Sequence, residues 1–188
     1  MSNVSLLTAV INHKRKSEKP AKKSSLIKQW LGIDISQSLS IRIGNYLEEF
    51  FVQLVDDISI LPDLELRDGQ RVINRDGEYH QVDLLVRIDD TIYHREIKCN
   101  LDLDRGKKRD VIYREECIVA ALQEKCLDSD IDIDSGVFCP FLDTSREVSG
   151  LGKVEGLAEF INTFNVDLTV DEFKELGRNE QIHRTLLK

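Results

Sequence analysis

Two apolar segments carry three ionisable side chains at positions where a β-strand would normally be hydrophobic. Residues 81–88 (QVDLLVRI) contain Asp83, and residues 91–99 (TIYHREIKC) contain Glu96 and Lys98. Burying an unpaired charge inside such a strand lowers the stability of the fold by several kcal/mol, because the charge loses its hydration. The three side chains therefore need to meet one another, or another charged group, in the folded protein.

The dipeptide Asp89-Asp90 separates the two segments and can form a two-residue hairpin turn. If Ile88 pairs with Thr91, Asp83 lies directly opposite Glu96. A shift of the register by one residue would separate the two acids. The prediction of a carboxylate pair therefore depends on this turn.

In the same register Gln81 lies opposite Lys98, and all four polar residues share one face because side chains alternate along a strand. His94 is expected on that face too, where a lone histidine is more often structural. The opposite face is expected to be apolar. It receives Val82, Leu84, Val86, Ile88, Tyr93, Ile97 and Cys99.

Two carboxylates about 4 Å apart repel each other by about 4 kcal/mol at an effective dielectric constant near 20. Lys98 alone can partly neutralise the pair, and the result would be a buried ionic network without activity. A divalent cation neutralises it more fully, because Mg²⁺ or Mn²⁺ prefers oxygen ligands. Such a site suits phosphodiester hydrolysis, with Lys98 orienting the attacking water.

The arrangement of Asp83 and the triplet Glu96-Ile97-Lys98 resembles the PD-(D/E)-x-K nuclease superfamily, and most of all its type II restriction endonucleases. Val82 stands where the family motif has proline. The resemblance covers residues 43–142. It implies an α/β fold in which helices flank a central mixed β-sheet. It also implies Mg²⁺, or Mn²⁺ as a substitute, bound by Asp83, Glu96 and the carbonyl oxygen of Ile97, with Lys98 at the attacking water.

Members of this superfamily often carry a glutamate on the helix before the motif, four residues after a glycine. Gly44 and Glu48 have this spacing, so the resemblance adds Glu48 to the metal ligands. Glu49 is the neighbouring alternative. Either acid could instead be an ordinary exposed residue of a helix.

Residues expected to contact DNA lie in two places. The polar segment after the triplet resembles part of some restriction enzymes and offers Asn100, Lys107 and Lys108. Residues 13–28 contain seven Lys or Arg and one Glu, a charge of +6 in a chain of net charge −8. We interpret residues 1–30 as a basic arm that binds phosphates, or as a solvated linker. The arm offers Lys14, Arg15, Lys16, Lys22 and Lys23.

Hydrophobic periodicity predicts the elements that position these residues. A helix is expected from an apolar stripe over residues 43–58, capped by Ser38 or Ser40. Residues 61–81 are expected to hold a short strand between two Asp-Gly turns. A helix of about 16 residues is expected within 104–126, and a strand at 136–142.

The region 143–188 is predicted to contain two helices that serve recognition or dimer formation. The first is expected over 152–164, and the second begins with a capping box of Thr169 and Glu172 and ends at Gly177. Residues 143–156 could form a recognition loop in which Arg146 and Lys153 contact bases or phosphates, or they could be merely a loop before a helix.

Length and composition indicate one globular domain: 188 residues, 41% hydrophobic and 32% charged. No apolar stretch reaches the length of a membrane span. The four cysteines form no C-x-x-C pair, which favours reduced thiols and a cytoplasmic protein.

We therefore expect a Mg²⁺-dependent endonuclease that cuts double-stranded DNA, most simply a type II restriction enzyme acting as a homodimer. One alternative is a structure-specific or repair nuclease, such as a junction resolvase or mismatch nickase. Another is a noncatalytic DNA-binding subunit with the same fold.

Overall fold

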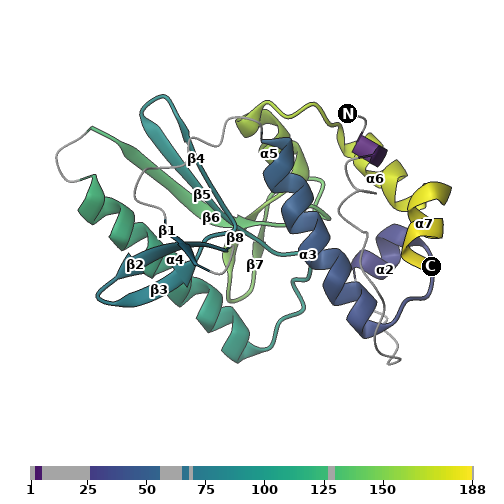
Figure 1. Ribbon diagram of the computed structural model, residues 1–188, viewed down its shortest axis with the longest axis horizontal. Coiled ribbons are helices and arrows are strands. Elements are labelled where there is room, and N and C mark those ends of the chain that lie inside the picture. Colours follow the sequence, from purple (N-terminus) through teal and green to yellow (C-terminus); the bar gives the residue numbers. More distant parts are fainter. Residues whose placement is uncertain (1–2, 6–25, 56–64, 68–69, 127–129, 188) are drawn as a thin grey trace.

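The computed structural model describes residues 3–5, 26–55, 65–67, 70–126 and 130–187, and shows an α/β protein with two β-sheets (Figure 1). The helices are α2 (Leu26–Leu31), α3 (Gln37–Leu54), α4 (Arg105–Lys125), α5 (Leu157–Phe164), α6 (Val170–Arg178) and α7 (Glu180–Leu187). The larger sheet is mixed and has the strand order β4-β5-β6-β8-β7, with β4 (Leu84–Ile88), β5 (Thr91–Ile97), β6 (Asp132–Phe138), β7 (Arg146–Val148) and β8 (Gly152–Glu155).

Strands β4 and β5 form the predicted hairpin in the predicted register. Ile88 pairs with Thr91 and Leu84 with Arg95. The turn residue Asp89 adopts a left-handed conformation (φ 52°), which a two-residue hairpin turn requires. Strand β6 lies parallel to β5 and is reached through α4, so β5, α4 and β6 form a crossover unit.

The predicted strand 81–88 is wrong at its beginning, because the chain changes sheet there. Gln81 pairs with Val72 in a small antiparallel sheet formed by β1 (Glu65–Arg67), β2 (Gln70–Arg75) and β3 (Glu78–Gln81). Gln81 is therefore not the cross-strand neighbour of Lys98. Asp83 lies at the break between the two sheets, immediately before β4.

Helices cover both faces of the larger sheet (Figure 1). Each face packs against its helices in a separate hydrophobic core. One face packs against α3 and α5 and buries the expected apolar residues Leu84, Val86 and Ile97. On the other face Leu85 packs against α4. Val82 was expected in the first core but lies in the second. The interruption of the strand at residues 82–83 points its side chain to the opposite face of the sheet.

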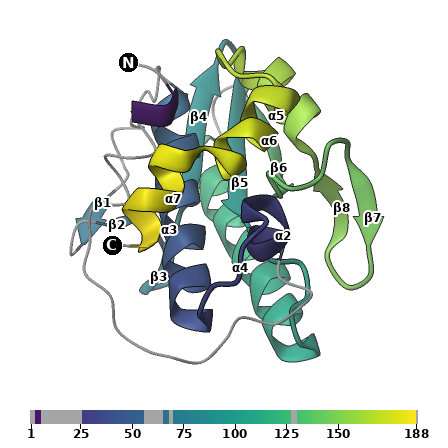
Figure 2. The same cartoon turned by 90° about the vertical axis from the view of Figure 1, so that its right-hand side faces the viewer.

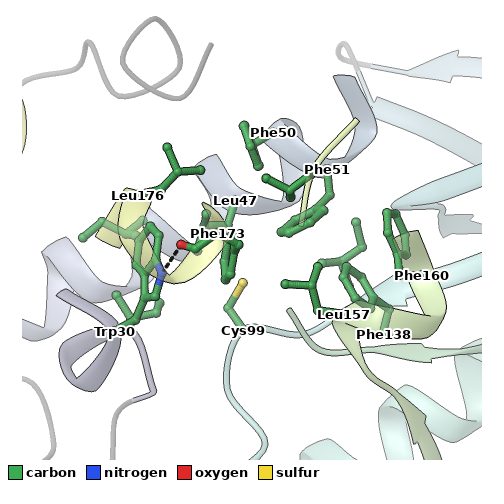
Figure 3. Close-up of a cluster of buried hydrophobic side chains, with 14 of the residues drawn as sticks. Trp30, Leu47, Phe50, Phe51, Cys99, Phe138, Leu157, Phe160, Phe173 and Leu176 are labelled. Carbon is green, nitrogen blue, oxygen red and sulfur yellow. Dashed lines mark hydrogen bonds between the residues drawn. The ribbon is translucent and has the colours of Figure 1, made fainter. Parts of the chain in front are cut away.

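Aromatic rings form the centre of the core between the sheet and α3 (Figure 3). Phe51 of α3 is fully buried and contacts the rings of Phe138, Phe160 and Phe173, with centroids 5.1–5.5 Å apart. The indole N–H of Trp30 donates to the carbonyl oxygen of Phe173 over 2.8 Å, which satisfies a buried donor. Strand β6, α2, α3, α5 and α6 thus share one core.

Helix boundaries differ from the predictions at several residues. Helix α3 covers most of the expected stripe but is capped by Ser36, whose side chain accepts from the N–H of Leu39, so the prediction of Ser38 or Ser40 was wrong. Helix α4 has 21 residues rather than about 16. Helix α2, at the end of the expected arm, was not predicted, and it buries Ile27 and Trp30.

The structure of the region after β6 also differs from the predicted elements. Strand β6 ends at Phe138, earlier than predicted, and residues expected as loop and helix form the β7–β8 hairpin, which extends from the sheet edge (Figure 2). The capping box of Thr169 and Glu172 is confirmed. Gly177 does not end its helix. It lies against Trp30, where an added Cβ would come within 2.6 Å of the ring.

Candidate active site

Asp83 is held at the end of β5 by a backbone hydrogen bond. Its Oδ2 accepts from the N–H of Ile97 over 2.9 Å, and its side chain is 7% exposed. Burial, and then repulsion from the Glu96 carboxylate, raise the pKa of Asp83 above its usual value. The first acid of the predicted site is therefore fixed beside the second.

Lys98 lies among three of the four groups that the resemblance assigns to a metal ion. Its Nζ is 2.8 Å from Oε1 of Glu96, 3.5 Å from Oδ2 of Asp83 and 3.1 Å from the carbonyl oxygen of Ile97. Burial alone would lower the pKa of Lys98, but the two carboxylates outweigh it and raise the pKa. The lysine thus stays charged and neutralises part of the carboxylate pair.

Glu48 is the glutamate of α3 that belongs to this group. Burial raises its pKa to about 7, and Asp83 adds to the rise while Lys98 opposes it. Glu49, the other option, is exposed and accepts a hydrogen bond from Gln53 on its own helix. The charges of Asp83, Lys98 and Glu96 therefore affect the pKa of Glu48.

The raised pKa of Glu48 predicts a stability change in Glu48→Gln. Between about pH 4.5 and pH 7 the folded wild type binds more protons at this site than the unfolded chain, so its unfolding free energy falls as pH rises. Glutamine has no proton to lose. Without divalent cations, Glu48→Gln should be more stable than wild type by roughly 2–3 kcal/mol at pH 8 and about equal at pH 4.

Urea denaturation at both pH values measures this difference, and Glu49→Gln on the same helix is the matched control. The control should change stability by less than about 0.5 kcal/mol at either pH. An equal gain for both variants at pH 8, or a gain for Glu48→Gln that is the same at pH 4, would contradict the assignment.

Arg114 of α4 also contacts the site, and sequence reasoning missed it. Its Nη1 donates to Oε1 of Glu96 over 2.9 Å, and its side chain is 36% exposed. Several other lysines and arginines occur along the same helix. Nothing in the sequence singles out Arg114, because the rotation of α4 against the sheet decides which cation reaches Glu96.

His94 lies on the same side of β5 as Glu96 and is fully buried. Its Nδ1 is 2.9 Å from the hydroxyl of Ser135 on β6, and that hydroxyl donates to Glu115 of α4. Burial, followed by the positive charges of Arg95 and Arg114, lowers the pKa of His94 to about 3. The neutral histidine therefore links β5, β6 and α4 beside the site.

The expected DNA contacts after the triplet have local partners. Asn100 is exposed and accepts from the N–H of Asp102. Lys107 pairs with Asp104, the N-cap residue of α4, at 3.7 Å. Lys108 donates to the carbonyl oxygen of Ser149 over 2.6 Å and so ties α4 to the β7–β8 hairpin.

Other candidate DNA contacts lie on the hairpin and in the basic arm. Arg146 on β7 and Lys153 on β8 are exposed. The predicted arm contacts Lys14, Arg15, Lys16, Lys22 and Lys23 lie outside the described residues.

The donor set of the site fits Mg²⁺ or Mn²⁺. Glu48, Asp83, Glu96 and the carbonyl of Ile97 supply hard oxygen ligands. The second carboxylate oxygen of Glu96, Oε2, is buried and has no hydrogen-bond partner among the described residues. In that part of the chain no three His, Cys, Asp or Glu side chains are already arranged to hold a metal ion. Instead, the ammonium of Lys98 contacts the expected ligands.

Comparison with models of protein families, with curated proteins and with solved structures found no match. Within the described ranges, no helix is long and apolar enough to cross a membrane.

Proposed function

We propose that this protein is a Mg²⁺-dependent endonuclease that hydrolyses phosphodiester bonds of double-stranded DNA. One observation carries the proposal. Lys98 Nζ lies within ion-pair distance of both Asp83 and Glu96, and the charges of all three residues affect the pKa of Glu48 on α3. Buried acids of this kind are costly for stability, and they are typical of sites that bind a cation.

Each residue then has a role in the proposed reaction. Asp83, Glu96 and the carbonyl of Ile97 would hold the cation, with Glu48 beside them. The bound cation would supply an activated water and polarise the scissile phosphate. Lys98 would orient the attacking water and stabilise the negative charge that grows on the phosphate. The mixed sheet with helices on both faces agrees with the expected α/β fold.

In its finer form, the proposal is a site-specific type II restriction endonuclease with a restriction-endonuclease-like core. A homodimer is proposed, since two active sites can then address the two strands of the duplex. We propose the cytoplasm as its compartment, because none of the four cysteines forms a disulfide in the described chain.

A noncatalytic DNA-binding subunit is the second candidate, and the contacts of Lys98 favour it. The ammonium already contacts both acids and neutralises part of their charge without a further cation. A purely structural network would have the same contacts.

Incubation of purified protein with supercoiled plasmid, linear phage DNA and Mg²⁺ tests the proposal. We expect cleavage by the wild type and a loss of roughly 10²–10⁴-fold in Asp83→Asn, because the exchanged group is a proposed ligand. Asp90→Asn, an exposed acid of the same hairpin, is the matched control and should cleave like the wild type.

The products separate the candidates. Discrete, reproducible fragments from linear DNA support a restriction enzyme, whereas cleavage restricted to branched or mismatched DNA supports a structure-specific or repair nuclease. DNA binding without cleavage and without divalent-cation binding supports the noncatalytic subunit. Equal rates for wild type and Asp83→Asn contradict the proposed site.

A further inference from the structure

The two oxygens of the Glu96 carboxylate have unequal surroundings. Oε1 accepts from both Lys98 Nζ (2.8 Å) and Arg114 Nη1 (2.9 Å). Oε2 is buried and accepts from no described group. A buried polar atom without a partner costs about 1–3 kcal/mol and calls for an explanation. The two donors on Oε1 set the rotation of the carboxylate and leave Oε2 available.

Lys98 and Arg114 differ in what else they contact. Lys98 also contacts Asp83 and the carbonyl of Ile97, so a cation that binds these atoms must displace the ammonium. Arg114 reaches Glu96 from α4 and, within the described site, donates to Glu96 alone among the three expected ligands. Arg114 can therefore keep its hydrogen bond when Lys98 moves.

We infer that Arg114 is a positioning residue that holds Glu96 so that Oε2 faces an incoming divalent cation. The inference rests on the proposed function, since it assumes a cation at Asp83 and Glu96. It adds a residue from α4 that the motif does not contain. Without Arg114, the carboxylate can rotate and place both oxygens on Lys98, which satisfies Oε2 and competes with the cation.

Removing Arg114 would also have an opposite effect on the affinity for the cation. The guanidinium is a positive charge close to the cation site, so its removal alone would strengthen cation binding. The two effects predict different orders of affinity. Positioning predicts that wild type binds more tightly than Arg114→Lys, which keeps one donor, and that Arg114→Met binds most weakly. Repulsion predicts that Arg114→Met binds most tightly and that wild type and Arg114→Lys bind about equally, because both keep the positive charge.

Titration calorimetry with Mn²⁺, without DNA, measures the affinities of the wild type and of both variants. We expect Arg114→Met to weaken binding about 10–100-fold, as is typical when a residue that orients a metal ligand is removed, and Arg114→Lys to lie between. Arg109→Met, an exposed arginine on the same helix, is the matched control and should bind like the wild type. DNA binding in EDTA should be unchanged in Arg114→Met.

The outcomes separate this inference from the proposed function. If Asp83→Asn abolishes Mn²⁺ binding while Arg114→Met binds as tightly as the wild type or more tightly, the inference is overturned and the metal site stands. If the wild type does not bind Mn²⁺, both are overturned. A loss of DNA binding in EDTA assigns Arg114 to the phosphate backbone and overturns the positioning role. Should Arg114→Met fail to fold, equal affinities of Arg114→Lys and wild type overturn it.

Discussion

Lys98→Met is expected to destabilise the fold and to abolish cleavage. The substitution leaves Asp83 and Glu96 buried at 7% and 2% side-chain exposure without the ammonium between them. Removing one partner of a buried ionic network costs roughly 3–5 kcal/mol. We expect about 3 kcal/mol, the lower end, because Arg114 still contacts Glu96. Urea denaturation at pH 8 without divalent cations measures the loss.

Excess Mg²⁺ should then stabilise Lys98→Met more than it stabilises the wild type, because the cation meets no competing ammonium at the two acids. Cleavage should stay at least about 10²-fold below wild type even in Mg²⁺, since the group that stabilises charge on the phosphate is missing. Recovery of both stability and activity in Mg²⁺ would assign Lys98 a structural role only.

Lys174→Met is the matched control for this experiment. Lys174 also pairs with an acid, Asp143 at 2.7 Å, but the two side chains are 46% and 60% exposed. Exposed pairs contribute at most about 1 kcal/mol. If Lys98→Met and Lys174→Met lower the free energy of unfolding by the same amount, the ion pairs of Lys98 contribute no more than an exposed pair. Such a result would contradict a buried ionic network around Lys98.

Phe51→Ala is expected to lower the unfolding free energy by about 3–5 kcal/mol, the usual cost of removing a fully buried aromatic ring. Phe51 is 0% exposed and contacts aromatic rings from β6, α5 and α6 (Figure 3). The cavity would therefore lie where four elements meet, and these cannot all move to fill it.

Denaturation by urea measures the change, and Ile41→Ala serves as control. Ile41 lies on the same helix but is 60% exposed, so its truncation should change stability by less than about 0.5 kcal/mol. Because α3 carries Glu48, Phe51→Ala should also weaken Mn²⁺ binding if the helix shifts. A loss below about 1 kcal/mol would show that the aromatic cluster repacks.

The hairpin that positions Asp83 and Glu96 could be predicted because two local signals agree there. Alternation of side chains and a two-residue turn at Asp89-Asp90 together fix one register, and that register is observed. The change of sheet near Val82 could not be predicted. It depends on whether Gln81 pairs with β2 or with β5, a competition between partners distant in sequence.

The β7–β8 hairpin was missed for a different reason. Its strands are three and four residues long, and Leu151, Val154 and Leu157 recur every three residues, as they would in a helix. The glycines gave the better signal: Gly150 and Gly152 adopt positive φ (78° and 72°), which a helix does not allow.

The site itself was predictable only in part. The spacing of Gly44 and Glu48 singled out the glutamate whose pKa is affected by Asp83, Lys98 and Glu96, because one helix holds Gly44 and Glu48 in a fixed relation. The contact of Arg114 depends on how α4 is rotated against the sheet, and rotation is set by packing of Val111, Ile118 and Leu122. Periodicity identifies such a buried stripe but not the strand residue that faces a given side chain.

Asp83 also lies in the short backbone segment that joins the two sheets. One side of it leads through Val82 directly into β3, and the other side is bound to Ile97 of β5. The end of β3 at Gln81 is two peptide units from the first acid. The β7–β8 hairpin connects to the site by another route, because Lys108 ties it to α4, whose Arg114 contacts Glu96. The small sheet therefore connects to the first acid of the site through the backbone, and the β7–β8 hairpin connects to the second acid through side chains.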